Sequence, residues 1–235
     1  MPLSLLALLT MHSSGQQIPS SSEFSAPLVR MFEAEWPNNR TVTIVCHGHS
    51  VPAGYFKTPV VQSFDAYPHL LHEAIKKKFP NAVVNVIVTA IGGENAESGA
   101  KRFDHDVMSL RPDVVTIDYA LNDRGIGLER ARASWQSMID TAKKGHVLVV
   151  LLTPSWDQSV HPERPGDPLN QHAVQVRELA KTNGVGLADS FQAYLDARDS
   201  GTKIPDLMSQ VNHPNRAGHE LILKKLLPWF GITST

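Results

Sequence analysis

Short apolar runs rich in β-branched residues alternate with segments of helical periodicity from Thr41 onward. In the helical segments, apolar residues recur at three- and four-residue spacing, as Leu70, Ala74 and Ile75 do before Pro80. Strands that alternate with helices need right-handed crossover connections, and such connections produce a parallel sheet with helices on both faces. The sequence therefore predicts an α/β protein, a three-layer α/β/α sandwich built on five parallel strands.

The individual elements follow from this pattern. It predicts strands at residues 42–46, 83–89, 114–119, 147–153 and 186–189. It predicts helices at residues 26–36, 65–79, 99–110, 128–144 and 170–182, followed by two more helices. Prolines and glycines mark several of the helix ends, among them Pro80, Pro112, Gly145 and Gly184.

Length and charge limit the classes of protein to consider. A chain of 235 residues with 42% hydrophobic content suits one domain, at residues 41–235, with residues 1–40 forming a lead-in and a helix that packs on it. Lys and Arg total 22 against 23 Asp and Glu, and neither sign forms a block. We therefore expect a small-molecule partner, with no nucleic acid and no membrane; the oligomeric state is left open. The single cysteine, Cys46, excludes an intramolecular disulfide.

The N-terminal stretch resembles an export signal only in part. Residues 3–9 are apolar, but no Lys or Arg precedes them and no small-residue cleavage site follows. The run is too short to span a bilayer, so a cytoplasmic and an exported location both remain open. Residues 11–25, rich in Ser, Gln and Gly, are predicted to be a flexible lead-in.

Four polar segments stand out against the strand and helix pattern. Three of them come directly after predicted strands: Gly48-His49-Ser50, Gly92-Gly93-Glu94-Asn95 and Leu121-Asn122-Asp123. The fourth, Asn212-His213-Pro214-Asn215, lies near the end of the chain. Because the carboxyl ends of parallel strands meet at one edge of the sheet, these segments are expected to form one active site.

The order and content of these segments resemble the SGNH, or GDSL-type, hydrolase family of serine esterases. Residues 48–54 are similar to the family's Gly-Asp-Ser-x-Thr-x-Gly segment, which implies that Ser50 is the nucleophile. By the same resemblance Gly93 supplies a backbone N–H, Asn122 a side-chain donor and His213 the general base. The resemblance covers about residues 41–230 and implies a flavodoxin-like sheet.

Elementary chemistry supports the same set of residues. A serine hydroxyl is a weak nucleophile unless an imidazole accepts its proton, as His213 could for Ser50. The tetrahedral intermediate also carries an oxyanion that needs fixed donors, which the N–H groups of Ser50 and Gly93 and the amide of Asn122 can supply. No metal ion and no organic cofactor is required.

Two positions depart from the family pattern. His49 stands where the family has Asp, and Gln210 stands three residues before His213, where the third member of the triad is expected. We therefore expect a Ser50–His213 dyad in which a carbonyl of Gln210 accepts the His213 Nδ1 proton. Asp206, seven residues before His213, is the alternative.

Each segment also has a simpler explanation. Gly92-Gly93 could hold a phosphate, Asn122-Asp123 could form a turn, and His213 could begin the last helix. The histidines at 47 and 49 suggest a metal site, but no cluster with ligand spacing accompanies them, and none is predicted.

Specificity is expected from loops beside these segments. Trp156, in the long loop at 153–170, is the candidate wall of a substrate pocket. Glu94 and Arg124 could also contact substrate, although surface pairing is the default for such charges. Bulky residues after Ser50 favour a short acyl group.

The predicted function is therefore a short-chain esterase of the acetyl type, with carbohydrate esters as the first substrates to test. Acyl transfer on the same site and a catalytically silent binding module are the alternatives.

Overall fold

The computed structural model describes residues 17–233 and contains the predicted parallel sheet. Its five strands are β1 (Thr41–Gly48), β2 (Val83–Val88), β3 (Val114–Asp118), β4 (Leu148–Leu152) and β5 (Gly186–Ala188). Their order is β2-β1-β3-β4-β5, and every neighbouring pair is parallel. This is the flavodoxin-like order, in which successive strands are added on one side of β1 and then, from β3 onward, on the other.

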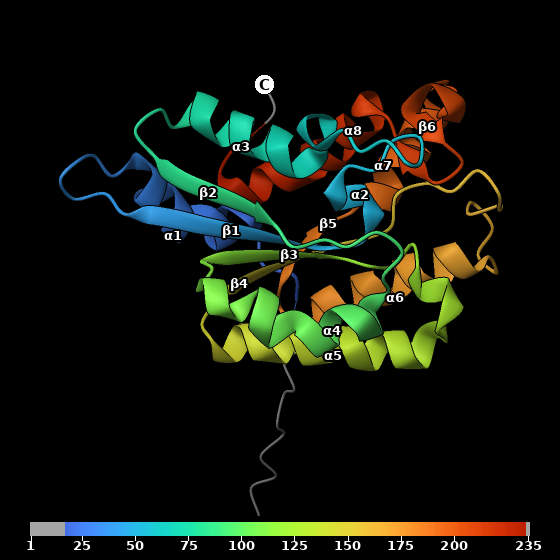
Figure 1. The fold of residues 1–235 in the computed structure, drawn as a ribbon, viewed down its shortest axis with the longest axis horizontal. Helices are drawn as coiled ribbons and strands as arrows, with labels where there is room; N and C mark the ends of the chain where they lie inside the picture. Colours follow the sequence, from blue (N-terminus) through green and yellow to red (C-terminus); the bar gives the residue numbers. More distant parts are fainter. Residues whose placement is uncertain (1–16, 234–235) are drawn as a thin grey trace, which may run out of the picture.

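Helices cover both faces of the sheet and complete the three layers (Figure 1). One side carries α3 (Tyr67–Lys78), α7 (Ser190–Asp199) and α8 (Arg216–Leu226), and the other carries α4 (Ala96–Asp106), α5 (Gly127–Lys144) and α6 (Pro168–Asn183). The short helix α2 (Ser50–Ala53) follows β1 directly. Short 3₁₀ turns lie at Ser63–Asp65, Met108–Leu110, Asp123–Gly125, Ile204–Leu207 and Leu227–Phe230.

The strands differ in how deeply they are buried. Every residue of β3 is buried, because helices cover it on both faces and strands flank it on both sides. At the edge of the sheet, β2 leaves Val83 and Val88 nearly half exposed. Apolar side chains form one cluster on each side of the sheet, and these two clusters anchor the layers.

The N-terminal helix begins earlier than predicted. Helix α1 spans Ser21–Glu33, because Ser20 and Glu23 form a capping box at its start. The expectation of a flexible lead-in is therefore wrong for residues 21–25. Phe24 packs edge-on against Trp229, with ring centroids 5.2 Å apart, which ties α1 to the end of the domain.

The apolar run at 3–9 lies outside the described residues. Between residues 17 and 233 no helix is long and apolar enough to cross a membrane.

A small antiparallel ribbon was not predicted. Strands β6 (Met208–Gln210) and β7 (His213–Pro214) pair with each other, and Gln210 lies opposite His213. His213 therefore belongs to a strand and does not begin the last helix. That helix starts only after Asn215, whose side chain accepts the Gly218 N–H as the cap.

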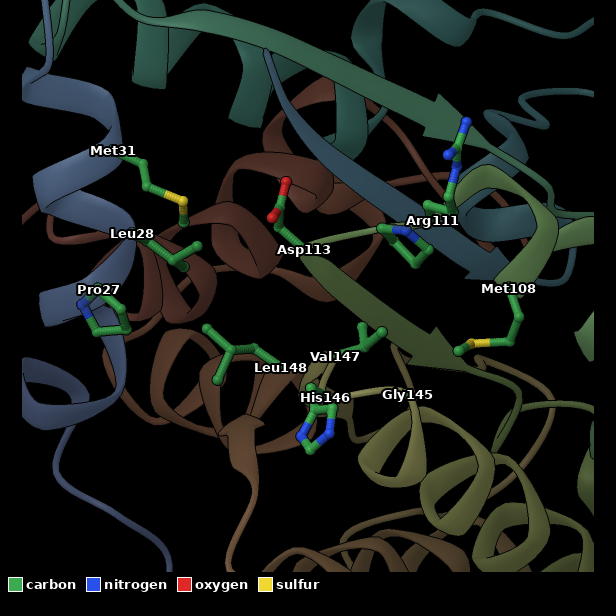
Figure 2. Close-up of a pocket in the computed structure, with 11 residues that line it drawn as sticks. Pro27, Leu28, Met31, Met108, Arg111, Asp113, Gly145, His146, Val147 and Leu148 are labelled. Atoms are coloured by element: carbon green, nitrogen blue, oxygen red, sulfur yellow. The ribbon is translucent and has the colours of Figure 1, made fainter. Parts of the chain in front are cut away.

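The two edges of the sheet differ in chemical content. A cavity of about 500 Å³ lies at the amino edge, between α1 and the residues that precede β3 and β4 (Figure 2). Leu28, Met31 and Asp113 are among its lining residues. The polar segments at 48–50, 92–95 and 121–123 instead follow the carboxyl ends of β1, β2 and β3. The candidate site therefore lies at the opposite edge.

Candidate active site

Ser50 stands at the turn between β1 and α2. The strand ends at Gly48, and Ser50 is the first residue of the helix. A Cβ on Gly48 would lie 2.5 Å from the Asp118 carbonyl oxygen, so only glycine lets the chain pass β3 this closely. The turn brings Ser50 to the carboxyl edge of the sheet, where only 6% of the residue's surface is exposed.

The imidazole of His213 contacts the Ser50 hydroxyl. His213 Nε2 lies 3.0 Å from Ser50 Oγ, and His213 Nδ1 lies 3.1 Å from the main-chain carbonyl oxygen of Phe56. Because a carbonyl oxygen can only accept, Nδ1 carries the proton and its N–H donates a hydrogen bond to the Phe56 oxygen. Nε2 is then left with a free lone pair directed at the serine hydroxyl. The two residues, 163 positions apart in the chain, form a dyad with the geometry of a nucleophile and its base.

The partner of His213 Nδ1 differs from both predicted partners. A main-chain carbonyl does orient the ring, but it is that of Phe56 and not a carbonyl of Gln210. The Gln210 side-chain oxygen instead accepts the Thr58 N–H at 3.0 Å, and its main-chain oxygen accepts from Gln158. Gln210 therefore holds the loop that carries Phe56.

Asp206 is also not the partner of His213. It lies in the turn before β6, and its main-chain oxygen accepts from the Asn215 side chain at 2.8 Å. Within residues 17–233 the ring nitrogens of His213 bond Phe56 and Ser50, and no hydrogen bond or ion pair joins His213 to the Asp206 side chain.

The environment of His213 sets its protonation. Burial lowers the pKa of His213 below its ordinary value of 6.5, and this effect outweighs the Phe56 carbonyl, which raises the pKa.

This burial predicts the pH dependence of hydrolysis. The base must be neutral to accept a proton, and the neutral fraction rises as the pH passes upward through the pKa. We therefore expect kcat/KM for p-nitrophenyl acetate to rise with pH, with a midpoint below 6.5, and then to reach a plateau. Initial rates from acid to mildly alkaline pH measure this midpoint. An activity that does not depend on pH, or a midpoint above 7, would contradict a buried His213 base.

Among the residues that the structure describes, N–H donors are left without an acceptor at Ser50, Gly93 and Asn122, the residues predicted to bind an oxyanion. Gly93 follows β2 with φ of 82°, a left-handed conformation that favours glycine, and open space lies where a side chain would project. Within residues 17–233 neither the Ser50 nor the Gly93 N–H donates a hydrogen bond. One amide hydrogen of Asn122 is donated to the Glu94 carbonyl at 2.8 Å, which leaves the second one free. Unused donors of this kind are what an oxyanion requires.

Asp123 holds two of these segments in place. Its carboxylate accepts the Ala96 N–H and the Trp135 indole N–H, each at 2.7 Å. Burial raises the pKa of Asp123 to about 6, despite both hydrogen bonds. The residue beside Asn122 therefore fastens its loop to the start of α4 and to α5, a structural role.

The predicted substrate contacts are arranged differently. Trp156 is buried and stacks on Phe191, with ring centroids 6.2 Å apart, so it belongs to the core and does not form a pocket wall. Glu94 pairs with Arg102 at 2.6 Å, and Arg124 pairs with Asp157. These ion pairs follow the default expectation for Glu94 and Arg124, and they leave neither charge free for a substrate.

Tyr55 is the bulky residue that does lie beside the site. Its ring is 5.8 Å from the His213 ring, and a Cβ on Gly92 would lie 2.7 Å from it. It therefore occupies the space between the base and the Gly92-Gly93 segment.

In the part of the chain from 17 to 233, no group of three or more His, Cys, Asp or Glu residues could hold a metal ion.

Sequence reasoning missed two contributors to the site. The first is the Phe56 carbonyl, which no side chain signals. The second is Asp118, at the end of β3, whose signal was a charged residue inside an otherwise apolar run. Its carboxylate lies within 3.3 Å of both His49 and Tyr67.

A five-stranded flavodoxin-like sheet that brings Ser, Gly, Asn and His together from four separate segments defines an SGNH-type hydrolase. The comparison with known families agrees. The chain belongs to the GDSL-like lipase/acylhydrolase family, whose model matches residues 46–221, and it is a carboxylic ester hydrolase.

Known relatives are distant in sequence and similar in fold. An acetylxylan esterase from Geobacillus stearothermophilus is 20% identical over 165 residues, which are 65% of this chain and 75% of that protein. Among solved structures, a variant of Axe2, an acetyl xylan esterase from the same organism, superposes with a TM-score of 0.71 at 18% identity, over 87% of this chain and 99% of that one.

A two-domain esterase active on acetylated mannans superposes with a TM-score of 0.72 at 19% identity, over 92% of this chain. The chain spans about half of that protein, 54% of its length. At these identities the superpositions establish the fold.

Proposed function

We propose that the protein is a serine esterase that removes short acyl groups, of the acetyl type, from carbohydrate esters through an acyl-enzyme on Ser50. The observation that carries this proposal is the 3.0 Å contact between Ser50 Oγ and the lone-pair nitrogen of His213. That nitrogen is available because the Phe56 carbonyl holds the proton on the other side of the ring.

The chemistry proceeds in two halves. Ser50 Oγ attacks the ester carbonyl while His213 Nε2 takes the hydroxyl proton, and the N–H groups of Ser50, Gly93 and Asn122 bind the oxyanion. The intermediate collapses to the acyl-enzyme as His213 returns the proton to the leaving alcohol. Water then attacks the acyl-enzyme with His213 again as base, and Ser50 regains its proton when the carboxylic acid leaves.

Two observations support a short acyl group on a sugar. Tyr55 fills the space beside His213 and Gly92, which restricts the room for an acyl chain. In addition, the acetylxylan esterase and the esterase active on acetylated mannans are enzymes that this chain resembles.

Acyl-chain selectivity tests the proposal. We expect the protein to release acetate from acetylated xylo- or manno-oligosaccharides, and to hydrolyse p-nitrophenyl acetate with a higher kcat/KM than p-nitrophenyl octanoate, because the octanoyl chain meets Tyr55. Direct measurement of acetate distinguishes hydrolysis from transfer to an added alcohol. A preference for the octanoate would contradict the short-acyl proposal, and replacing Tyr55 with Ala should narrow the difference between the two esters if Tyr55 causes it.

A further inference from the structure

His49 lies beneath the Ser50 hydroxyl and is fully enclosed. Its Nδ1 is 3.4 Å from Ser50 Oγ and accepts the Val51 N–H at 3.2 Å, which makes it the N-cap of α2. Its Nε2 lies 3.3 Å from Asp118 Oδ1. The alignment of that last pair is not ideal for a hydrogen bond, yet neither atom has another partner within residues 17–233.

The neighbours of His49 determine where its proton lies. A backbone N–H can only donate, so the contact from Val51 requires an unprotonated Nδ1. The proton therefore lies on Nε2, facing the carboxylate of Asp118. The tautomer of His49 is thus the opposite of that of His213, whose proton lies on Nδ1.

Asp118 is a buried carboxylate whose nearest donors are few. Tyr67 directs its hydroxyl to Asp118 Oδ2 at 3.3 Å, and His49 faces Oδ1. Its main-chain oxygen also accepts the His49 N–H at 3.2 Å, so a backbone hydrogen bond joins the two residues beside the 3.3 Å contact of their side chains. Removing the donor beside a buried carboxylate leaves its charge unpaired, which is costly in a protein interior.

We propose that His49 and Asp118 are a matched pair of positioning residues for the nucleophile turn. Asp118 holds the imidazole in the tautomer that caps α2, and the cap fixes the N–H and the hydroxyl of Ser50. A carboxylate at position 49, which related segments carry, could also accept the Val51 N–H. Here it would face the buried carboxylate of Asp118, and two like charges at this place would displace the turn. The inference rests on the proposed role of Ser50.

A double substitution tests the pair. We expect His49→Asp to lower kcat for p-nitrophenyl acetate by about 100-fold, because a displaced nucleophile loses that much, while KM changes little. Asp118→Asn in the same chain removes the second charge and should restore kcat at least about tenfold. Full activity of His49→Asp would overturn the proposal, and so would a double variant no better than the single one, because a role in packing alone gives no such rescue.

Two further variants keep the test decisive if His49→Asp does not fold. Asn presents an oxygen near the place of Nδ1 and cannot ionise, so His49→Asn should exceed His49→Ala in kcat by roughly fivefold, the effect of a helix cap. Equal activity of these two variants would overturn the capping role. Asp113→Asn is the matched control for Asp118→Asn: this residue precedes the amino end of the same strand, and kcat should not change.

Failure of the pair can be separated from failure of the esterase proposal. A fluorophosphonate probe applied to the unaltered protein reports whether Ser50 is a nucleophile. Labelling of Ser50 without the rescue described above would overturn only the pair. Absence of labelling and of hydrolysis would overturn the esterase proposal itself.

Discussion

Replacing Ser50 with Ala is expected to lower kcat for p-nitrophenyl acetate by about 10⁵- to 10⁶-fold, the loss typical for removal of a serine nucleophile. The reason is that the acyl-enzyme can no longer form. His213→Ala should cost nearly as much, because the two groups act as a unit across the 3.0 Å contact. The double variant should be little worse than either single one. Steady-state rates, together with loss of fluorophosphonate labelling in Ser50→Ala, measure this effect.

Ser190 provides the matched control for Ser50. It is also a buried serine at the first position of a helix that follows a strand, α7 after β5, and its hydroxyl has no partner within the described residues. Ser190→Ala should keep the activity and the labelling of the unaltered protein. Ser50→Ala activity within tenfold of the original would show that another group performs the chemistry.

Loss of the Asn122 amide should have the second largest effect. Asn122→Ala is expected to lower kcat by about 100- to 1,000-fold with little change in KM, because an oxyanion donor acts mainly on the transition state. The geometry that supports this is the fixed amide: one hydrogen is held by the Glu94 carbonyl at 2.8 Å, so the other has a defined direction. Kinetics with a soluble acetyl ester measure kcat and KM separately.

A matched asparagine distinguishes catalysis from stability. The Asn183 side chain also donates to a main-chain carbonyl, that of Leu179 at 2.9 Å, but it lies at the end of α6, before the amino end of β5. Asn183→Ala should therefore lower the melting temperature and leave kcat of the folded protein unchanged. If Asn122→Ala affected only the melting temperature, its role would be structural and the oxyanion assignment would be wrong.

The strands and helices were predictable because their signals are local. All five strands and the helices from α3 to α6 lie within a few residues of the predicted ranges, since short apolar runs and the helical spacing of apolar residues can be identified in the sequence itself. Helix α1 begins five residues before the predicted start at residue 26, because Ser20 and Glu23 form a capping box there. The ribbon of β6 and β7 was missed because its strands are too short to show a period.

The contents of the site were only partly predictable. The sequence predicts Ser50, Asn122 and His213 as site residues because their segments occur in a recognisable order. The structure brings Ser50 Oγ to 3.0 Å from His213 Nε2. The family pattern predicts the orienting acceptor of His213 near residue 210, where the acid of the triad would stand, but the acceptor is the Phe56 carbonyl. Trp156 was expected to line a pocket because it lies in a long loop, but the loop folds back over the core.

By itself, the sequence determined the alternation of strands and helices, the parallel sheet that follows from it, and the polar segments at its carboxyl edge. These depend on periodicity and on strand ends, which are properties of neighbouring residues. Only the tertiary structure decided which carbonyl accepts the hydrogen bond from His213 Nδ1 and which carboxylate faces His49. Every residue has a main-chain carbonyl, and the Phe56 oxygen reaches an imidazole 157 positions away solely because of the path of the intervening chain.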